Sequence, residues 1–261
     1  MHEGIEDLIA NHGCGKLALR RSRKEAKNAR MIPALRLILA APLFFLVACS
    51  SQREEKRSAL VMSEAALRAA EYDLIDVRTF IPSISVDLRY GTAQNPTKRP
   101  IYPTDMPCLV KTATALKLRK AQEILKTRGL GLRIWDAWRP PEVQVLLVEA
   151  DGNTGLFMDP KSAWSRHCSG TAVDVTVVDL KGREQPMPSY HDEGGPAAHY
   201  LYQGSEPQIK RNLHCLQRAM FDAGFIILDT EWWHFDDSDF YTVPTPVVFG
   251  HQVGIHLAQN P

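Results

Sequence analysis

A long apolar run near the N-terminus limits what this chain can fold into. Residues 37–48 are twelve consecutive apolar or proline residues, LILAAPLFFLVA. As a helix rising ~1.5 Å per residue, they would reach about 18 Å, short of the ~30 Å hydrocarbon core of a bilayer, and Pro42 interrupts them. We therefore expect the hydrophobic region of a secretory signal, not a spanning helix, and assign residues 1–48 to a leader.

The run ends in residues 46–49, LVAC, which resemble the lipobox of bacterial lipoproteins. In that interpretation Cys49 becomes the lipidated N-terminus, and the protein is an exported lipoprotein that faces the periplasm and is anchored to a membrane. The alternative is an ordinary buried segment that happens to end in cysteine. Residues 50–57, SSQREEKR, suit a polar tether, and Met31 is then an alternative start.

The remaining residues, 58–261, are expected to form one domain, because they contain no internal repeat or second linker. Over the whole chain, the hydrophobic share of 44% and the charged share of 23% are close to the globular average. The 31 basic and 30 acidic residues leave a net charge of +1, which argues against a nucleic-acid partner. The two parts of the chain differ in charge. Residues 1–48 hold eight basic and four acidic residues, whereas the rest of the chain holds 23 basic and 26 acidic residues.

Periodicity predicts an α+β domain. Helices are expected at residues 63–68, 109–128 and 208–223, and from Pro140 onward. Strands are expected at residues 83–90, 131–137, 171–178, 225–228 and 231–235. The helix at 109–128 is inferred from an apolar stripe formed by Leu116, Leu118, Ala121, Ile124 and Leu125.

The strand at 171–178 contains a carboxylate where an apolar residue is expected. Alternation places Asp174 and Thr176 on one face, opposite the valines at 173, 175 and 177. A buried carboxylate costs several kcal/mol unless it is paired. A metal shared with His167 would supply that pairing, but so would a His–Asp hydrogen bond or an arginine partner, and this segment alone favours neither.

A second polar pair lies about sixty residues later, in Glu231-Trp232-Trp233-His234-Phe235. His234 would complete three protein ligands, and Glu231 would supply the base that a catalytic zinc site needs. The alternative is an aromatic core strand with two incidental polar residues. On a flat strand, residues three apart point to opposite faces, so Glu231 and His234 converge only through a twist, bulge or bend.

Together these segments resemble the zinc D-alanyl-D-alanine metallopeptidases, whose pattern is Ser-x-His-x-x-Gly-x-Ala-x-Asp followed by Glu-x-Trp-His. The matching residues are Ser165, His167, Gly170, Ala172, Asp174, Glu231, Trp233 and His234. Residues 87–93 (DLRYGTA), residues 135–140 (WDAWRP) and the doubled Trp make the chain most similar to the D-alanyl-D-alanine dipeptidases of the vancomycin-resistance type. The resemblance runs from about residue 86 to 236 and implies a small antiparallel-rich central sheet flanked by helices.

The resemblance also implies roles for individual residues. Glu231 would act as general base and then as general acid. Arg139 would stabilise the oxyanion of the tetrahedral intermediate, whereas its structural alternative is an ion pair with Asp136. One Zn²⁺ per chain would be bound by three ligands, His167, Asp174 and His234.

Substrate contacts are implied less directly. Ser165 and Tyr90 match positions that line the family's substrate pocket. Asp192 would hold the free ammonium of the substrate, because residues 187–192 resemble a family stretch written Met-Gly-Ser/Thr-x-Phe-Asp. Here Pro188 replaces the glycine and His191 replaces the phenylalanine, so the local backbone is expected to differ.

The function implied is hydrolysis of the dipeptide D-Ala-D-Ala, or a similar small dipeptide, to free amino acids in peptidoglycan turnover or recycling. One alternative is a D,D-carboxypeptidase or other murein peptidase acting on longer stem peptides. Another is a lipid-anchored zinc-fold binding module without turnover, although such a module has no use for Glu231. The sequence does not indicate an oligomeric state.

Three cysteines follow Cys49. Because the number is odd, at most one disulfide forms within the chain. A bridge between Cys108 and Cys215 is the preferred pairing, because Cys168 adjoins the candidate ligand His167.

Overall fold

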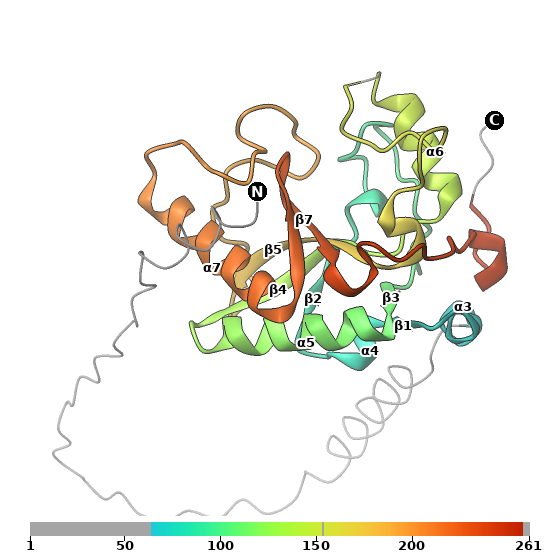
Figure 1. The fold of residues 1–261 in the computed structure, drawn as a ribbon, viewed down its shortest axis with the longest axis horizontal. Coiled ribbons are helices and arrows are strands. Elements are labelled where there is room, and N and C mark those ends of the chain that lie inside the picture. The colour runs from blue at the N-terminus through green and yellow to red at the C-terminus, as the bar shows by residue number, and fades with distance from the viewer. Residues whose placement is uncertain (1–63, 153, 258–261) are drawn as a thin grey trace, which may run out of the picture. The chain divides into compact units, whose positions relative to one another are not determined.

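A computed structural model describes residues 64–152 and 154–257, so the predicted leader, Cys49 and tether lie outside the described residues. The α+β prediction is confirmed (Figure 1). Within the described ranges, no helix is both long and apolar enough to cross a membrane. The strands are β1 (Leu74–Asp76), β2 (Ser85–Val86), β3 (Leu109–Lys111), β4 (Leu130–Asp136), β5 (Ala172–Asp179), β6 (Phe225–Leu228) and β7 (Glu231–Asp237). The α-helices are α3 (Glu64–Ala69), α4 (Val77–Phe80), α5 (Thr112–Lys126), α6 (Pro141–Ala150) and α7 (Pro207–Ala223).

Five strands form the central sheet in the order β2-β4-β5-β7-β6. Only the short β2–β4 pairing is parallel, and the other three pairings are antiparallel. The strands β1 and β3 form a separate antiparallel pair. Short 3₁₀ turns connect these elements, at Ala70–Tyr72, Arg89–Gly91, Arg166–Ser169, Ser238–Phe240 and Gly250–Val253.

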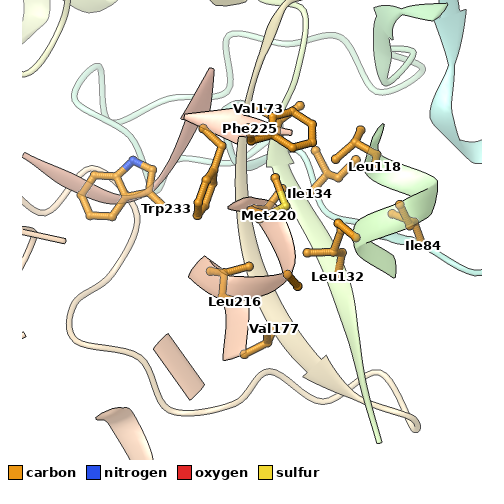
Figure 2. Close-up of a cluster of buried hydrophobic side chains, with 14 of the residues drawn as sticks. Ile84, Leu118, Leu132, Ile134, Val173, Val177, Leu216, Met220, Phe225 and Trp233 are labelled. Atoms are coloured by element: carbon orange, nitrogen blue, oxygen red, sulfur yellow. The ribbon is translucent and has the colours of Figure 1, made fainter. Parts of the chain in front are cut away.

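The main core lies between this sheet and the helices α5 and α7, which pack against each other and against the sheet (Figure 1). Figure 2 shows Ile134 of β4 and Val173 of β5 close to Leu118 of α5, with Met220 of α7 beside them. Val175 and Val177 belong to the same cluster. The predicted alternation of β5 is therefore confirmed: Val173, Val175 and Val177 face the core, so Asp174 and Thr176 point to the other side of the sheet.

Two predicted elements differ from the structure. In the segment 83–90 only Ser85 and Val86 pair with β4, because the chain then turns through Arg89–Gly91 and buries Tyr90 completely. The helix predicted from residue 109 begins at Thr112, because Leu109–Lys111 pair with β1. Leu116 of the predicted stripe is 46% exposed, whereas Leu118, Ala121 and Leu125 are buried.

The predicted disulfide between Cys108 and Cys215 is absent. Both residues lie in the main core, and Cys168 is also a buried thiol. Burial raises the pKa of the Cys168 thiol to about 12 and also raises that of Cys108. Cys108 and Cys168 therefore behave as small apolar core residues, with little thiolate available to form a disulfide.

The turn before β5 is built on Gly170. Ser165 begins this turn and accepts a hydrogen bond from the backbone N–H of His167. Gly170 ends it with φ +73°, and its carbonyl accepts a hydrogen bond from the N–H of Lys111 at 2.8 Å. A Cβ added at Gly170 would lie 2.5 Å from Cδ2 of Leu74. Only glycine therefore allows both this backbone conformation and the close packing against β1.

We predict that Gly170→Ala destabilises the fold more than Gly182→Ala does. Gly182 has a similar φ of +77°, but its added Cβ would meet nothing within 4 Å. Backbone strain alone should therefore cost Gly182→Ala roughly 1 kcal/mol, and the clash with Leu74 should add about 1–3 kcal/mol in Gly170→Ala. At ~2–4 °C per kcal/mol, thermal unfolding resolves the two variants. Equal melting temperatures would show that Leu74 does not constrain this turn.

Candidate active site

Three metal-ligating side chains meet on the face of the sheet opposite the main core. Asp174 of β5 and His234 of β7 are direct cross-strand partners, which places their side chains side by side. His167 reaches them from the 3₁₀ turn that precedes β5. One possible ligand atom from each residue can be chosen so that all three lie within 4.8 Å of one another. The structure therefore brings together the three ligands predicted from the sequence.

The spacing of these atoms suits a zinc ion. Nε2 of His167 lies 3.3 Å from Oδ1 of Asp174 and 3.2 Å from Nδ1 of His234, and the last pair, Nδ1 of His234 and Oδ1 of Asp174, is 3.1 Å apart. A tetrahedral zinc with bonds of ~2.0–2.1 Å separates its ligands by about 3.3–3.4 Å. The three residues thus fit one face of a zinc coordination tetrahedron and leave its fourth position open.

The outer nitrogens of both histidines have hydrogen-bond acceptors. Nδ1 of His167 lies 2.7 Å from the carbonyl oxygen of Ala137, which can only accept, so Nδ1 carries the proton and Nε2 offers its lone pair to the site. Nε2 of His234 lies 3.1 Å from Oδ1 of Asp236. Such contacts fix the tautomer and ring orientation of metal-binding histidines. The donor set is therefore arranged for a cation.

Asp174 is the most heavily contacted carboxylate of the site. Its side chain is only 2% exposed. Its Oδ1 faces the two histidine ligands, and its Oδ2 lies 3.1 Å from Nε2 of His191 and 3.5 Å from the Arg139 guanidinium. Burial alone would raise the pKa of Asp174, but the surrounding histidines hold it well below its ordinary value. The carboxylate is therefore ionised and available as a ligand.

A second buried carboxylate, Asp136, faces Asp174 across the β4–β5 pairing, next to an irregularity in the register. Arg139 lies between them, with Nε 2.8 Å from Oδ2 of Asp136 and Nη1 2.8 Å from Oε1 of Gln144. The ion pair with Asp136, considered from the sequence as an alternative role for Arg139, is therefore present. It does not remove Arg139 from the site, because the guanidinium also contacts Asp174 and lines the cavity.

The irregular start of β7 brings Glu231 to the same site. Ile227 of β6 pairs with Phe235, yet the next residue of β6, Leu228, pairs with Glu231. β7 therefore bulges between Glu231 and Phe235. This bulge allows Glu231 and His234 to reach the same side of the sheet, although they are three residues apart. Glu231 and His234 both line the cavity. Burial raises the pKa of Glu231 to about 7, a value suited to exchanging protons near neutral pH.

The cavity over these residues has a volume of about 800 Å³. Ser165 and Asp192 line it, and Asp192 has a φ of +58°. Tyr90 is completely buried, with its ring 5.0 Å from the Arg139 guanidinium carbon. Burial raises the pKa of Asp192, whereas a hydrogen bond with the Tyr90 hydroxyl lowers it. The structure thus places Asp192 and Ser165 at the cavity wall and Tyr90 behind it.

Two further residues of the site are not singled out by the sequence pattern. Asp236 orients His234 and forms an ion pair with Arg166 at 3.2 Å. His191, whose side chain is 4% exposed, contacts Asp174. The signal that marks His191 is its departure from the family stretch, where phenylalanine stands. Asp236 follows His234 by two residues, so alternation along β7 places both on one face.

Comparison with known proteins agrees with this geometry. The family model described as D-Ala-D-Ala dipeptidase matches residues 70–249. A D-alanyl-D-alanine dipeptidase of Escherichia coli is 32% identical over 164 residues, which are 63% of this chain and 84% of that protein. Proteins of the same name from Enterococcus faecium and Enterococcus faecalis are 27% and 29% identical, each over 57% of this chain and 83% of their own length. The chain belongs to the D-Ala-D-Ala dipeptidase family.

Proposed function

We propose that the protein is a zinc-dependent dipeptidase that hydrolyses D-Ala-D-Ala, or a similar small dipeptide, to free amino acids. The observation that carries this proposal is the convergence of three ligand atoms, the partly buried Glu231 carboxyl and the buried Arg139 on one cavity. Three protein ligands with an open fourth position are the arrangement of catalytic zinc. A bound Zn²⁺ would lower the pKa of water and polarise the peptide carbonyl.

Glu231 would move the proton in this reaction. Its carboxylate accepts a proton from the attacking water and then donates it to the leaving amine nitrogen. Both transfers require that the carboxyl can gain and lose a proton near neutral pH. Burial, which raises the pKa of Glu231 to about 7, provides that property.

Arg139 would stabilise the negative charge that develops on the carbonyl oxygen. Its guanidinium is held in place by Asp136 and Gln144, each at 2.8 Å. A cation already fixed in a buried site needs little reorganisation when that charge appears. The ion pair with Asp136 therefore supports the proposed role of Arg139 by orienting it.

Asp192 would provide the preference for a dipeptide. Its side chain is 8% exposed and lines the cavity, where its carboxylate is an acceptor suited to the free ammonium of a substrate. A longer peptide replaces that ammonium with a neutral amide and would leave the carboxylate poorly paired, which is costly in a buried site. The cavity volume of about 800 Å³ nevertheless leaves room for a longer chain, so hydrolysis of stem peptides by a D,D-carboxypeptidase activity is the second candidate.

Export and anchoring form a separate part of the proposal. The apolar run at 37–48 and the LVAC sequence support a lipoprotein whose Cys49 is lipidated and whose enzyme domain faces the periplasm. Peptidoglycan fragments would be accessible to it there.

The substrate assay separates the two candidate activities. Zinc-loaded protein should hydrolyse free D-Ala-D-Ala and leave a pentapeptide stem ending in D-Ala-D-Ala intact. In Asp192→Asn, kcat/KM for the dipeptide should fall about 10- to 100-fold, because a charge-assisted hydrogen bond worth ~1.5–3 kcal/mol is lost. Cleavage of the stem peptide without cleavage of the dipeptide would refute the dipeptidase proposal.

Replacement of Glu231 tests its role as acid and base. Glu231→Ala and the isosteric Glu231→Gln should lower kcat by about 10²- to 10⁴-fold. Both should retain one zinc per chain, because Glu231 is not among the three ligands. Elemental analysis of the purified variants provides the metal control. Unchanged turnover in Glu231→Gln would remove this residue from the mechanism.

Replacement of Cys49 tests the anchoring proposal. In a bacterial host, the wild-type chain should incorporate labelled fatty acid and sediment with membranes. Cys49→Ser should incorporate none and should appear in the soluble exported fraction or as an unprocessed precursor. Labelling that persists in Cys49→Ser would show that the lipid is attached elsewhere.

A further inference from the structure

The ring of His191 packs among aromatic side chains, but this packing does not by itself require a histidine. His191 lies in the loop between β5 and α7, and its ring packs against three aromatic rings with centroid distances of 5.4–5.8 Å. These neighbours are Tyr90, Trp135 and Trp233. A phenylalanine, as in the family stretch, would satisfy this packing. What a histidine adds to this packing is its two imidazole nitrogens.

One of these nitrogens lies between two carboxylates. Nε2 of His191 is 3.1 Å from Oδ2 of Asp174 and 3.4 Å from Oδ1 of Asp192. An ionised carboxylate can only accept hydrogen bonds, so Nε2 carries the proton and donates it. The other oxygen of Asp174 faces the histidine ligands. A donor at this point thus leaves Oδ1 of Asp174 available to a metal ion.

We propose that His191 is a positioning residue for the metal site: its Nε2–H holds Oδ2 of Asp174, so that Oδ1 remains directed at the metal. The proposal rests on the zinc site proposed above. It assigns to His191 a contribution to metal affinity and not only to packing.

The alternatives available to Asp174 show why this donor matters. Without His191, the nearest other donor to Oδ2 is the Arg139 guanidinium at 3.5 Å, the outer limit for a hydrogen bond. Arg139 is also committed to Asp136 and Gln144 at shorter distances. The Asp174 side chain is 2% exposed, so bulk water cannot easily replace the lost donor. The carboxylate would then turn away from its ligand orientation.

Zinc affinity measured by chelator competition tests this proposal. His191→Phe and His191→Leu both remove the donor, whereas the side-chain amide of His191→Gln retains one. Loss of a hydrogen bond to a metal ligand typically weakens metal binding 10- to 100-fold. We expect that loss in the Phe and Leu variants, and a dissociation constant within about threefold of wild type in the Gln variant. His251→Phe, which alters a largely exposed histidine (69%), is the matched control and should bind zinc normally.

The pattern across variants distinguishes positioning from packing. If His191 only filled space, the Phe variant would bind zinc as wild type does, and the Gln variant would be the impaired one. That result, or equal zinc affinity in all variants, would overturn the proposal. Thermal unfolding of the metal-free variants identifies any variant that does not fold. If the Phe variant does not fold, the zinc affinity of the Leu variant is compared with that of the Gln variant instead.

This test is independent of the substrate. Weaker zinc binding in the Phe and Leu variants would support the role of His191 even if D-Ala-D-Ala were not hydrolysed. Conversely, hydrolysis of D-Ala-D-Ala with unchanged zinc affinity would leave the proposed function intact and refute the role of His191.

Discussion

The site depends on a carboxylate held inside an apolar strand. Asp174 lies in β5, between valines that face the main core, and an unpaired charge at that depth would cost several kcal/mol. Hydrogen-bonding and positively charged side chains from the surrounding elements offset this cost. β7 provides His234, the preceding turn provides His167, and the segment after β4 provides Arg139. A metal ion would complete this arrangement, because it supplies positive charge where three ligand atoms already converge.

One face of the central sheet packs against the main core, and the other face bears the residues of the candidate active site. Side chains of β4 and β5 fill the core against α5 and α7, which fixes the strands that present Asp136 and Asp174. Two acidic residues opposite each other on adjacent strands would normally destabilise a sheet. Here Arg139 contacts both, so the repulsion is offset and the arginine is oriented by the pair. The arrangement is thus prepared before any substrate enters.

Much of this could be predicted from the sequence, because the determining signals are local. Alternation in β5 predicts that Asp174 is a buried carboxylate, and the resemblance of two short motifs to a known family implies the roles of His167, His234 and Glu231. Long-range effects could not be predicted in the same way. The bulge that lets Glu231 join His234 arises from pairing with β6, and the short β2 arises because the chain turns to bury Tyr90. The contact of His191 with Asp174 likewise depends on where a loop returns to the sheet.

The proposed function requires one metal ion, bound by His167, Asp174 and His234, for hydrolysis. This requirement can be measured by titrating metal-free protein with Zn²⁺ and recording the rate of D-Ala-D-Ala hydrolysis at each step. We expect a rate that rises linearly and stops rising at one equivalent of zinc, with no activity before the first addition. Activity in the metal-free protein, or a rate that rises until two equivalents are bound, would contradict it.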